Sequence, residues 1–525
     1  MRTSTRRFKK LLIANRGEIA VRIARTCRNL GIRTIGIYSE QDRRSLHLDF
    51  CDEVVSLGEG PLSETYLNIP KIAEAIGRSR ADAVHPGYGF LSERAAFARA
   101  VTGAGAVFVG PSPESIEAMG DKIEAKRRMA AMGVPLLPGT EGGVKDFSEA
   151  KKAAAKIGYP VLLKAAAGGG GKGMRIVRGG KNSEKELAAS LESASREAKN
   201  YFGDGTVYVE KFLENPHHVE VQVLGDGHGG GGHVFDRECS IQRRHQKLVE
   251  ESPAPLLMKH PKAKERVLEV ATQVVERMKY ASAGTLEFLA GDGGGFYFLE
   301  MNTRLQVEHP VTEWVTGLDL VERQIRVAEG ERLKSGELTG AKKAGQRGHS
   351  IEARVYAETP FEYLPCGGKV KALRLPCGPF VRVDSAIYPG YEVLTDYDPT
   401  LLKLSVWGAD RAQAVARLRS AVDELRILGV GSNQGFFFAL TREKDFIEGN
   451  YGTPYIDRRM KDLKAIHGAE MARLLPLLAH GAIEAVRARP AGTLVKAGEK
   501  AGEKAGEARS AWESSARAAA LRGER

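Results

Sequence analysis

Apolar positions recur at helical and strand-like intervals through the first part of the chain. Residues 9–40 read as a strand, a helix and a second strand, with Gly31 at the point where a helix ends. The apolar positions of that helix fall on one face: Ala20, Ile23, Ala24, Cys27 and Leu30. Short apolar runs at 81–86 and 105–110 read as further strands with helices between them. The pattern predicts an α/β domain with an open parallel sheet over residues 1–121.

The pattern continues beyond this domain as helices and short strands. A helix is predicted to begin after Ser112, which can cap it, with Pro113 in its first turn. Helices and strands then alternate over residues 122–335, and a Gly/Lys-rich linker is predicted at 336–348. Residues 349–455 carry strands with few long helices, which indicates a third domain of the α+β class.

The last segment, residues 456–525, differs in composition from the rest of the chain. It contains the run AGEKAGEKAGEA, which has low complexity and buries too little to order itself. Residues 470–488 have the pattern of a helix, although Pro476 is expected to interrupt it. We expect this segment to be a flexible or weakly helical tail.

Residues 296–310, FYFLEMNTRLQVEHP, begin as a strand and then depart from the usual composition of one. At a period of two, one face carries only polar side chains: Glu300, Asn302, Arg304, Gln306 and Glu308. An ordinary half-buried surface strand would also alternate in this way. Solvated strand faces are usually Thr, Lys and Ser, however, whereas this row groups acids with amides and a guanidinium. The row is therefore a candidate functional site.

A hairpin over residues 284–302 accounts for the first half of this row. Two strands flank a glycine-rich turn near Gly293, so antiparallel pairing would set Glu287 opposite Glu300, within one residue. Like charges placed directly opposite each other are destabilising unless a cation lies between them. Asn302 adds a neutral oxygen, and all-oxygen sites of this kind suit Mg²⁺ or Mn²⁺ carrying phosphate. The simpler alternative is that one of the two glutamates is solvated.

The glycine-rich segment YPVLLKAAAGGGGKGMRIV, residues 159–177, is a candidate phosphate-binding loop. Glycines let backbone N–H groups approach an anion, and Lys164 and Lys172 supply positive charge. The loop is not a P-loop, because no helix follows and the GxxxxGK[ST] spacing is absent. We interpret it as a strand–loop–strand flap over a triphosphate, with a plain mobile hairpin as the alternative.

Two further polar segments are weaker candidates. His245 and Lys247 lie in RECSIQRRHQKLVEESPAP, which is either a solvated basic face or, beside a nucleotide and a metal, an anion cradle. In YVEKFLENPHHVEVQV a strand runs into residues 210–213. That segment is either a plain strand edge or one whose free backbone groups and carboxylate contact the edge of an adenine.

Composition excludes several other classes of protein. The net charge of +12 is concentrated at the ends, with five Lys/Arg in residues 1–10 and fourteen basic against nine acidic residues in 456–525. No nucleic-acid-binding motif interrupts the chain and no apolar run approaches a membrane span, so we expect neither nucleic acid nor membrane as a partner. Five cysteines without metal spacing or disulfide density favour a cytoplasmic protein.

Seven motifs, in order from about residue 8 to residue 455, resemble those of biotin carboxylase, the ATP-grasp component of biotin-dependent carboxylases. They are IANRGEIAVRIAR, HPGYGFLSE, MGDKIEAK, GGGGKGMR, VEKFLENPHHVE, RRHQK and EMNTRLQVEHPVTE. The resemblance implies that residues 122–335 form an ATP-grasp domain, with its flap subdomain at about 139–212. Residues 1–121 and 349–455 would then be the N-terminal and C-terminal biotin carboxylase domains.

The resemblance also assigns a role to each matching position. Phosphate or ribose contacts are implied at Lys122, Lys164, Gly170, Gly171, His218 and His245. The adenine hinge is implied at Glu210, Lys211, Phe212 and Leu213, and two Mg²⁺ or Mn²⁺ sites at Glu287, Glu300 and Asn302. The bicarbonate pocket is implied at Lys247, Arg304, Gln306 and Val307, the general base at Glu308 and the biotin contact at Arg354.

The implied reaction joins bicarbonate to biotin in a ligase that consumes ATP and forms a C–N bond. Lys247 and Arg304 would hold bicarbonate beside the γ-phosphate, and Glu308 would take the bicarbonate proton. The resulting carboxyphosphate would give CO₂ and phosphate, and the phosphate would deprotonate biotin. Arg354 would stabilise the developing ureido enolate.

The biotin itself is expected on a separate carrier protein. The attachment sequence Ala-Met-Lys-Met is absent, and no segment is long enough for a carboxyltransferase domain. The expected partners are a biotin carboxyl carrier protein and carboxyltransferase subunits, with the chain itself a homodimer. Acetyl-CoA carboxylase, and so fatty acid synthesis, is the first expectation. Propionyl-CoA or pyruvate carboxylase is the alternative, because the carboxyltransferase selects the final substrate. Thr359, which stands where an acid is common in the family, weakens the assignment to a subtype but not the expected activity.

Two other functions stay open at this point. One is a non-catalytic ATP-binding scaffold, which loss of Lys247, Arg304 or Glu308 would have favoured, yet all three are present. The other is a different ATP-grasp ligase, which would not need the RRHQK and RLQVEHP motifs.

Overall fold

A computed structural model describes residues 7–140, 142–144, 146–165, 174–202, 205–244, 246–334, 345–394 and 397–487. The chain divides into two compact units, Met1–His467 and Gly468–Arg525. Every element that bears on the candidate site belongs to the first unit. In the described part of the chain, no helix combines the length and the apolar character needed to cross a membrane.

The N-terminal region contains a parallel sheet, as predicted. Its five strands lie in the order β3-β2-β1-β4-β5, and every neighbouring pair is parallel. The strands are β1 (Lys10–Ile13), β2 (Arg33–Tyr38), β3 (Glu53–Ser56), β4 (Ala83–His85) and β5 (Val107–Phe108). The helices between them are α1 (Gly17–Asn29), α2 (Ile69–Ser79) and α3 (Ala95–Gly103).

Local sequence explains where the helices of this region begin and end. α1 is followed by Gly31 at φ +71°, a conformation that glycine adopts without strain. The side chain of Ser112 accepts a hydrogen bond from the backbone N–H of Ser115 and so caps α4 (Pro113–Gly120), as expected. α4 ends at Gly120, and α5 (Lys122–Ala131) begins after a single intervening residue, Asp121.

The glycine-rich segment forms the predicted hairpin. β6 (Val161–Ala165) and β7 (Met174–Val177) pair antiparallel, with Lys164 opposite Met174. The pair joins β8 (Val207–Lys211) in a sheet of order β7-β6-β8, against which α6 (Phe147–Ile157) and α7 (Ser183–Phe202) pack. Gly170, Gly171 and Lys172 lie outside the described residues.

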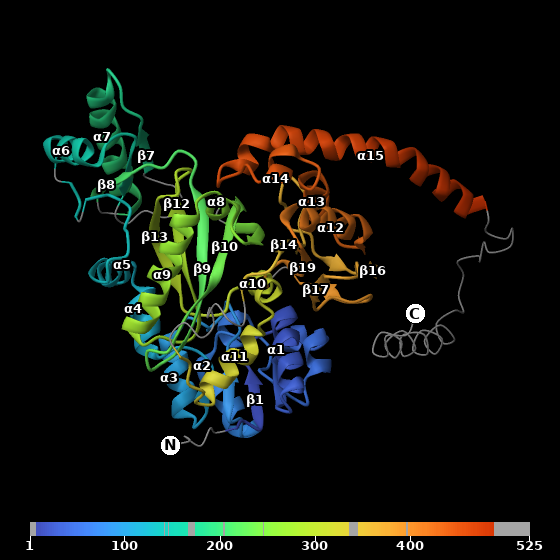
Figure 1. Cartoon of the computed structure of the whole chain (residues 1–525). Coiled ribbons are helices and arrows are strands. Elements are labelled where there is room, and N and C mark those ends of the chain that lie inside the picture. Colours follow the sequence, from blue (N-terminus) through green and yellow to red (C-terminus); the bar gives the residue numbers. More distant parts are fainter. Residues whose placement is uncertain are drawn as a thin grey trace, which may run out of the picture. The chain divides into compact units, whose positions relative to one another are not determined.

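An eight-stranded sheet carries most of the candidate site. Its order is β13-β12-β9-β10-β11-β14-β19-β17, and all its neighbouring strands are antiparallel (Figure 1). The strands are β9 (His217–Asp226), β10 (Gly231–Arg243), β11 (Gln246–Ser252), β12 (Ala281–Ala290), β13 (Phe296–Asn302), β14 (His349–Tyr356), β17 (Val381–Ser385) and β19 (Thr400–Gly408).

This sheet continues across the linker predicted at 336–348. β11 precedes the linker and β14 follows it, yet the two pair directly, with Glu250 opposite Glu352. The strands after the linker therefore extend the central sheet. The reason is that the edge of β11 would otherwise present unpaired backbone groups, which β14 satisfies.

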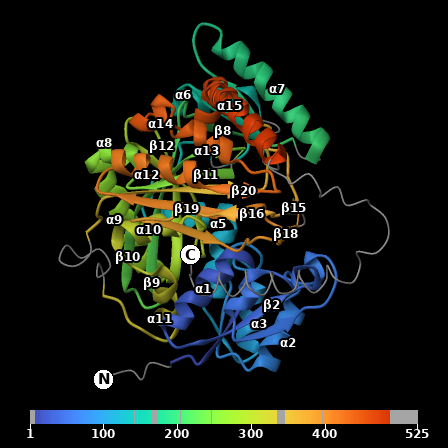
Figure 2. The same ribbon diagram turned by 90° about the vertical axis from the view of Figure 1, so that its right-hand side faces the viewer.

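Helices and small sheets complete the first unit. The helices are α8 (Pro255–Lys259), α9 (Pro261–Met278), α10 (His309–Thr316), α11 (Leu320–Ala328), α12 (Arg411–Glu424), α13 (Gln434–Leu440) and α14 (Lys444–Glu448). The small pairs are β15 (Gly368–Lys369) with β18 (Glu392–Val393), and β16 (Ala372–Arg374) with β20 (Arg426–Leu428). The buried face of α12, including Leu418, shares a core with Leu402 and Leu404 of β19. Figure 2 labels both elements in the ribbon.

The C-terminal segment differs from the expectation in two ways. α15 runs from Tyr455 to Arg487, and its first turns bury Tyr455, Ile456 and Leu463, so the packed body extends past residue 455. The prediction that Pro476 interrupts the helix is wrong, since α15 continues through it. Proline removes only one hydrogen bond from a helix, and the other bonds of a 33-residue helix remain. The repeat AGEKAGEKAGEA lies outside the described residues.

Candidate active site

The β12–β13 hairpin places two carboxylates face to face, as the sequence predicted. Glu287 pairs with Glu300, and the next pair is Phe288 with Phe298, so Leu299 forms a bulge. Burial and the nearby Glu287 charge raise the pKa of Glu300 above its ordinary value. A carboxylate that is difficult to ionise beside another carboxylate is the electrostatic signature of a site that favours a cation.

Glu287 is surrounded by hydrogen-bond donors. Its Oε1 atom accepts from Lys247 Nζ at 3.0 Å, Asn302 Nδ2 at 2.9 Å and Gln306 Nε2 at 2.7 Å. Nε2 of His218 lies 2.9 Å from its Oε2 atom. Burial alone would raise the pKa of Glu287, but Lys247 and His218 outweigh it and hold the pKa well below the ordinary value. Glu287 is therefore ionised and carries a negative charge.

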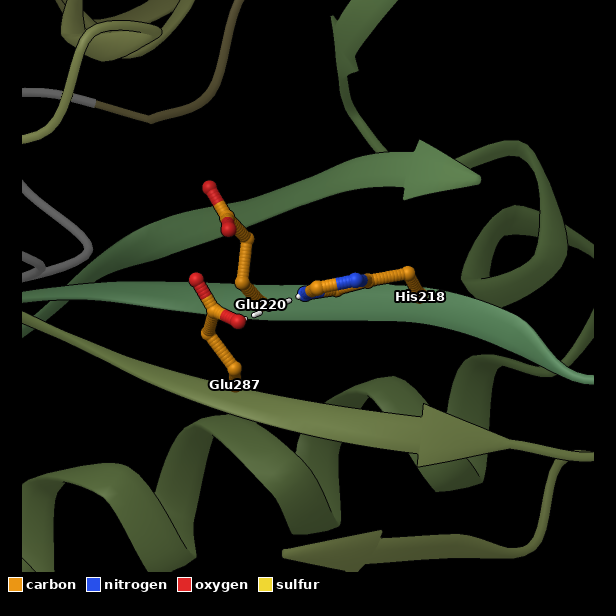
Figure 3. A group of neighbouring side chains, drawn as sticks. All are labelled: His218, Glu220 and Glu287. Atoms are coloured by element: carbon orange, nitrogen blue, oxygen red, sulfur yellow. Dashed lines mark ion pairs between the residues drawn. The ribbon is translucent and has the colours of Figure 1, made fainter. Parts of the chain in front are cut away.

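A third acid, Glu220, joins this group. One ligand atom each of His218, Glu220 and Glu287 lie within 4.8 Å of one another, with the first two on β9 and the third on β12 (Figure 3). The carboxylate of Glu220, however, accepts hydrogen bonds from Arg237 and, at 2.6 Å, from Lys247. Of the three residues expected to bind the metal, Glu287 alone belongs to this group, and the assignment of Glu300 and Asn302 as further oxygen ligands stays a prediction.

Lys247 is an internal cation and not part of a solvated basic face. Its Nζ atom lies 2.6 Å from Glu220, 3.0 Å from Glu287 and 2.6 Å from Glu308. Burial alone would lower the pKa of Lys247, but the neighbouring acidic groups raise it well above the ordinary value. A bulge at Leu248, where Gln242 pairs with Lys247 but Ile241 with Val249, lets the strand direct this side chain into the cluster.

Glu308 is held between two cations. It is the residue immediately before α10, and its Oε1 atom lies 2.6 Å from Lys247 Nζ while Oε2 lies 2.9 Å from Arg354 Nη2. Burial would raise the pKa of Glu308, but Lys247 and Arg354 hold it well below the ordinary value. In this geometry Glu308 is ionised but is a weak base.

Arg354 connects Glu308 to a second buried acid. Its Nε atom donates to Glu250 Oε1 at 2.5 Å, from β14 to the neighbouring β11. Burial raises the pKa of Glu250 to about 7, although Arg354 opposes this effect. Arg354 is therefore shared between one carboxylate that ionises readily and one that does not.

Arg304 and Val307 lie in the irregular segment that joins β13 to α10. Nε of Arg304 donates to Glu93 Oε2 at 2.8 Å, and its Nη2 donates to Asn302 Oδ1 at 2.8 Å. The carbonyl oxygen of Val307 accepts from Lys403 Nζ at 2.9 Å. The structure thus brings Arg304 to the metal-ligand candidates and Val307 to a buried lysine.

The residues expected to bind nucleotide lie along β6, β8 and β9. Lys164 lies on β6, Glu210 and Lys211 on β8, and His218 on β9, while the charge of Lys122 acts on Glu300. Two backbone N–H groups of the 210–213 segment are already bonded, since Lys211 donates to Pro138 O at 2.7 Å and Phe212 to Pro160 O at 3.0 Å. The adenine contact expected at 210–213 stays a prediction, and it would use groups of the segment other than these two N–H groups. His245 lies outside the described residues.

Four buried residues of the site escaped the sequence analysis. They are Glu220, Gln222, Arg237 and Glu250, each at most 1% exposed. Arg237 donates to Glu220, to Gln222 at 2.6 Å and to Gln306 at 2.7 Å. These hydrogen bonds orient the three acceptor side chains. The alternation of His218, Glu220 and Gln222 within a strand was the available signal.

Comparison with known protein families agrees with this architecture. Residues 7–116 match the N-terminal domain of biotin carboxylase, residues 121–336 the ATP-binding domain of the carbamoyl-phosphate synthase L chain, and residues 352–458 the C-terminal domain of biotin carboxylase. The matches cover the parallel sheet, the glycine-rich hairpin and the strands that follow the linker.

Named relatives match across the same region. The biotin carboxylase of Nostoc sp. is 46% identical over 87% of this chain and 100% of its own length. A pyruvate carboxylase subunit from Methanothermobacter thermautotrophicus is 47% identical over 87% of this chain and 91% of its own. The propionyl-CoA carboxylase alpha chain of Homo sapiens is 46% identical over 86% of this chain. That protein is longer, and the match covers 61% of its length.

A solved structure shows what one such relative binds. The biotin carboxylase domain dimer of the Hydrogenobacter thermophilus 2-oxoglutarate carboxylase, in complex with MgADP, ADP and bicarbonate, is 44% identical, with a TM-score of 0.76. The match covers 87% of this chain and 98% of that one. Fold and site together define an ATP-dependent ligase. The chain belongs to the biotin carboxylase family.

Proposed function

We propose that this enzyme carboxylates the biotin of a separate carrier protein, with bicarbonate as the carbon source and carboxyphosphate as the intermediate. The observation that carries the proposal is the position of Glu308 between Lys247 and Arg354, at 2.6 and 2.9 Å. A carboxylate between these two cations supports the proposal, because Lys247 would suit bicarbonate and Arg354 would suit the ureido oxygen of biotin.

The arrangement suggests how bicarbonate itself would activate the base. Bicarbonate bound at Lys247 competes with Glu308 for that cation, so the pKa of Glu308 rises toward its ordinary value. Glu308 then takes the bicarbonate proton, and the bicarbonate oxygen bonds to the γ-phosphorus as the bond to the ADP oxygen breaks. Gln306 and the Val307 backbone complete the pocket, and Arg304 adds charge beside Asn302.

The second half of the proposed reaction uses Arg354. Carboxyphosphate divides into CO₂ and phosphate, and the phosphate takes the proton from N1′ of biotin. The charge that develops on the ureido oxygen is stabilised by Arg354, and the deprotonated nitrogen then bonds to CO₂. Because Arg354 also binds Glu308, both steps share one buried cluster.

The proposed metal ligands are Glu287, Glu300 and Asn302. A divalent ion bound there, Mg²⁺ or Mn²⁺, would neutralise charge on the ATP phosphates. We assign Lys122, Lys164, His218 and the 210–213 segment to ATP, together with Gly170, Gly171 and His245 on the resemblance alone. The division into domains 1–121, 122–335 and 349–455 is part of the same proposal.

We place the chain in an acyl-CoA carboxylase, with acetyl-CoA as the first candidate substrate. The partners would be a biotin carboxyl carrier protein and carboxyltransferase subunits, and the chain itself would be a homodimer. Relatives named for pyruvate and propionyl-CoA support those alternatives equally well. The buried Lys247–Glu308–Arg354 cluster disfavours a non-catalytic scaffold, because scaffolds have no need of opposed, desolvated charges.

Reconstitution with purified carriers tests this assignment. The enzyme is incubated with ATP, Mg²⁺ and ¹⁴C-bicarbonate, together with carriers from acetyl-CoA, propionyl-CoA and pyruvate carboxylases in separate reactions. We expect label on the biotinyl lysine, fastest with the acetyl-CoA carboxylase carrier. Faster labelling of another carrier would move the enzyme to that carboxylase, and no labelling of any carrier would contradict the proposed function.

A further inference from the structure

Lys403 is a buried lysine in the middle of an apolar strand. It lies on β19 between Leu402 and Leu404, and only 1% of the residue is exposed. A buried ammonium group is strongly destabilising unless nearby groups compensate its charge and its hydrogen-bonding capacity. Its partners therefore indicate why a cation is retained at this position.

The ammonium group of Lys403 joins three separate parts of the first unit. It donates to the carbonyl oxygen of Val307 at 2.9 Å. It lies 3.3 Å from Glu18 Oε1, in the first turn of α1, and 3.9 Å from Asp384 Oδ2 on β17. The hydrogen bond to Val307 is thus the closest of these contacts.

The two carboxylates do not by themselves account for Lys403. Asp384 already has a closer partner, because Arg382 Nη2 lies 2.8 Å from it. Among the described residues, the carboxylate oxygens of Glu18 have no hydrogen-bonding contact other than the long one to Lys403, at 3.3 Å. Burial raises the pKa of Glu18 to about 7 despite the nearby lysine, so Glu18 is a weakly ionised partner near neutral pH.

The position of the Val307 carbonyl matters for the active site. That carbonyl belongs to the peptide group that joins Val307 to Glu308. In the β14–β19 ladder, Lys403 stands directly opposite Arg354, which binds the Glu308 carboxylate. Neighbouring side chains of two strands thus hold the main chain just before Glu308 and the side chain of Glu308 itself.

We infer that Lys403 is a positioning residue that fixes the peptide between Val307 and Glu308, and so sets the geometry of the bicarbonate pocket. In the proposed mechanism, Lys403 touches neither bicarbonate nor the reacting atoms. The inference rests on the proposed function of the 304–308 segment. Removing the amine should release the peptide and weaken bicarbonate binding, while the ATP site on β6, β8 and β9 keeps its structure.

Three variants separate this role from a purely structural one. Lys403→Met removes the amine while keeping much of the side-chain volume. Glu18→Gln removes the carboxylate and leaves the bond to Val307 in place. The double variant Lys403→Met/Glu18→Gln removes both charges, so Glu18 is not left as a buried carboxylate without its cation.

Steady-state kinetics with free biotin and thermal unfolding are measured for each variant. We expect Lys403→Met to raise KM for bicarbonate about tenfold or more, since a hydrogen bond to a charged donor is lost. KM for ATP should change less than about twofold. Glu18→Gln should keep the wild-type KM for bicarbonate. The double variant should recover thermal stability but keep the high KM.

Two results would overturn the inference. One is a wild-type KM for bicarbonate in folded Lys403→Met. The other is a wild-type KM for bicarbonate in the double variant, which would mean that Lys403 only compensates the charge of Glu18. Gln306→Ala, measured in parallel, tests the pocket itself. If the KM for bicarbonate is unchanged in Gln306→Ala, both the proposed pocket and the inference about Lys403 are wrong. If that KM rises in Gln306→Ala but stays normal in the Lys403 variants, only the inference about Lys403 is wrong.

Discussion

The Nζ atom of Lys247 lies 2.6 Å from Oε1 of Glu308, where β11 meets the start of α10. An ion pair this close keeps the carboxylate ionised but weakens it as a base, since Lys247 holds the pKa of Glu308 low. A substrate anion that draws the lysine away restores basicity at the moment when a base is needed. In the proposed mechanism, the ion pair would therefore couple bicarbonate binding to activation of Glu308.

Replacing Glu308 with Gln should abolish biotin carboxylation while ATP still binds. Glutamine keeps the size of the side chain and can still accept from Lys247, but it cannot take a proton. We expect kcat to fall by at least about a hundredfold, a usual loss for a general base, with an unchanged Kd for ATP. Stopped assays of biotin carboxylation and titration calorimetry with ATP measure the two quantities.

Glu322→Gln, on the more exposed surface of α11, serves as the matched control for Glu308→Gln and should behave as wild type. The base assignment would be wrong if Glu308→Gln lost ATP affinity and activity in equal measure. That result would indicate a role for Glu308 in assembling the site as a whole.

Replacing Glu287 or Glu300 with Gln should raise the Mg²⁺ concentration needed for half-maximal activity. Each change removes one charged oxygen from the pair that faces across the β12–β13 hairpin. Titration of activity with Mg²⁺ at saturating ATP measures the effect. Asp292→Asn, in the turn of the same hairpin, should leave the Mg²⁺ dependence unchanged, and unchanged dependence in both glutamate variants would refute the metal assignment.

Replacing Glu250 with Gln should change stability in a pH-dependent way. The pKa of Glu250 is raised by burial to about 7, so the protonated form stabilises the fold below pH 4.5 and this contribution is lost as pH rises through 7. Glutamine resembles the protonated form at every pH. The variant should therefore gain on the order of 2 kcal/mol relative to wild type between pH 5 and pH 8.

Urea unfolding of wild type and Glu250→Gln at the two pH values measures this difference. A variant that became relatively less stable at pH 8 would show that Glu250 is ionised in the fold and that its attraction to Arg354 exceeds the effect of burial.

Two truncations should distinguish the tail from the body. Cutting near Pro490 should leave carboxylation of free biotin intact and alter stability little. Cutting before Tyr455 removes three buried side chains, Tyr455, Ile456 and Leu463, each worth about 1.5–3 kcal/mol of burial. That loss is comparable to the whole stability of a typical domain, so this variant should not fold.

Circular dichroism and free-biotin assays of both truncated chains measure the outcomes. If the chain cut near Pro490 stayed folded but lost most of its activity, the tail would be part of the active site. A stable, active chain cut before Tyr455 would show that α15 contributes nothing to the core.

The sequence predicted those parts of the site that depend on local spacing. Glu287 and Glu300 could be paired because a single glycine-rich turn connects their strands. The partners of Lys247 could not be found in this way, because Glu220 and Glu308 lie 27 and 61 residues away along the chain. Which strands become neighbours is decided by packing of the whole sheet, and no local pattern records it.

The same limit explains the error at Pro476 and the continuity of the sheet across the linker. A proline lowers helix propensity locally, but the turns on either side decide whether the helix persists. The pairing of Glu250 with Glu352 likewise depends on an open strand edge, which is visible only once β11 has a place in the sheet.

The fate of the bicarbonate oxygens tests the central claim most directly. The enzyme is given ATP, Mg²⁺, biotin and ¹⁸O-labelled bicarbonate, and the released phosphate is analysed by mass spectrometry before the label exchanges with water. Attack of bicarbonate on the γ-phosphate predicts one ¹⁸O atom per phosphate, with release stimulated by biotin. Phosphate that carries oxygen from water alone would mean that ATP is hydrolysed directly, and would contradict the roles proposed for Lys247, Glu308 and Arg354.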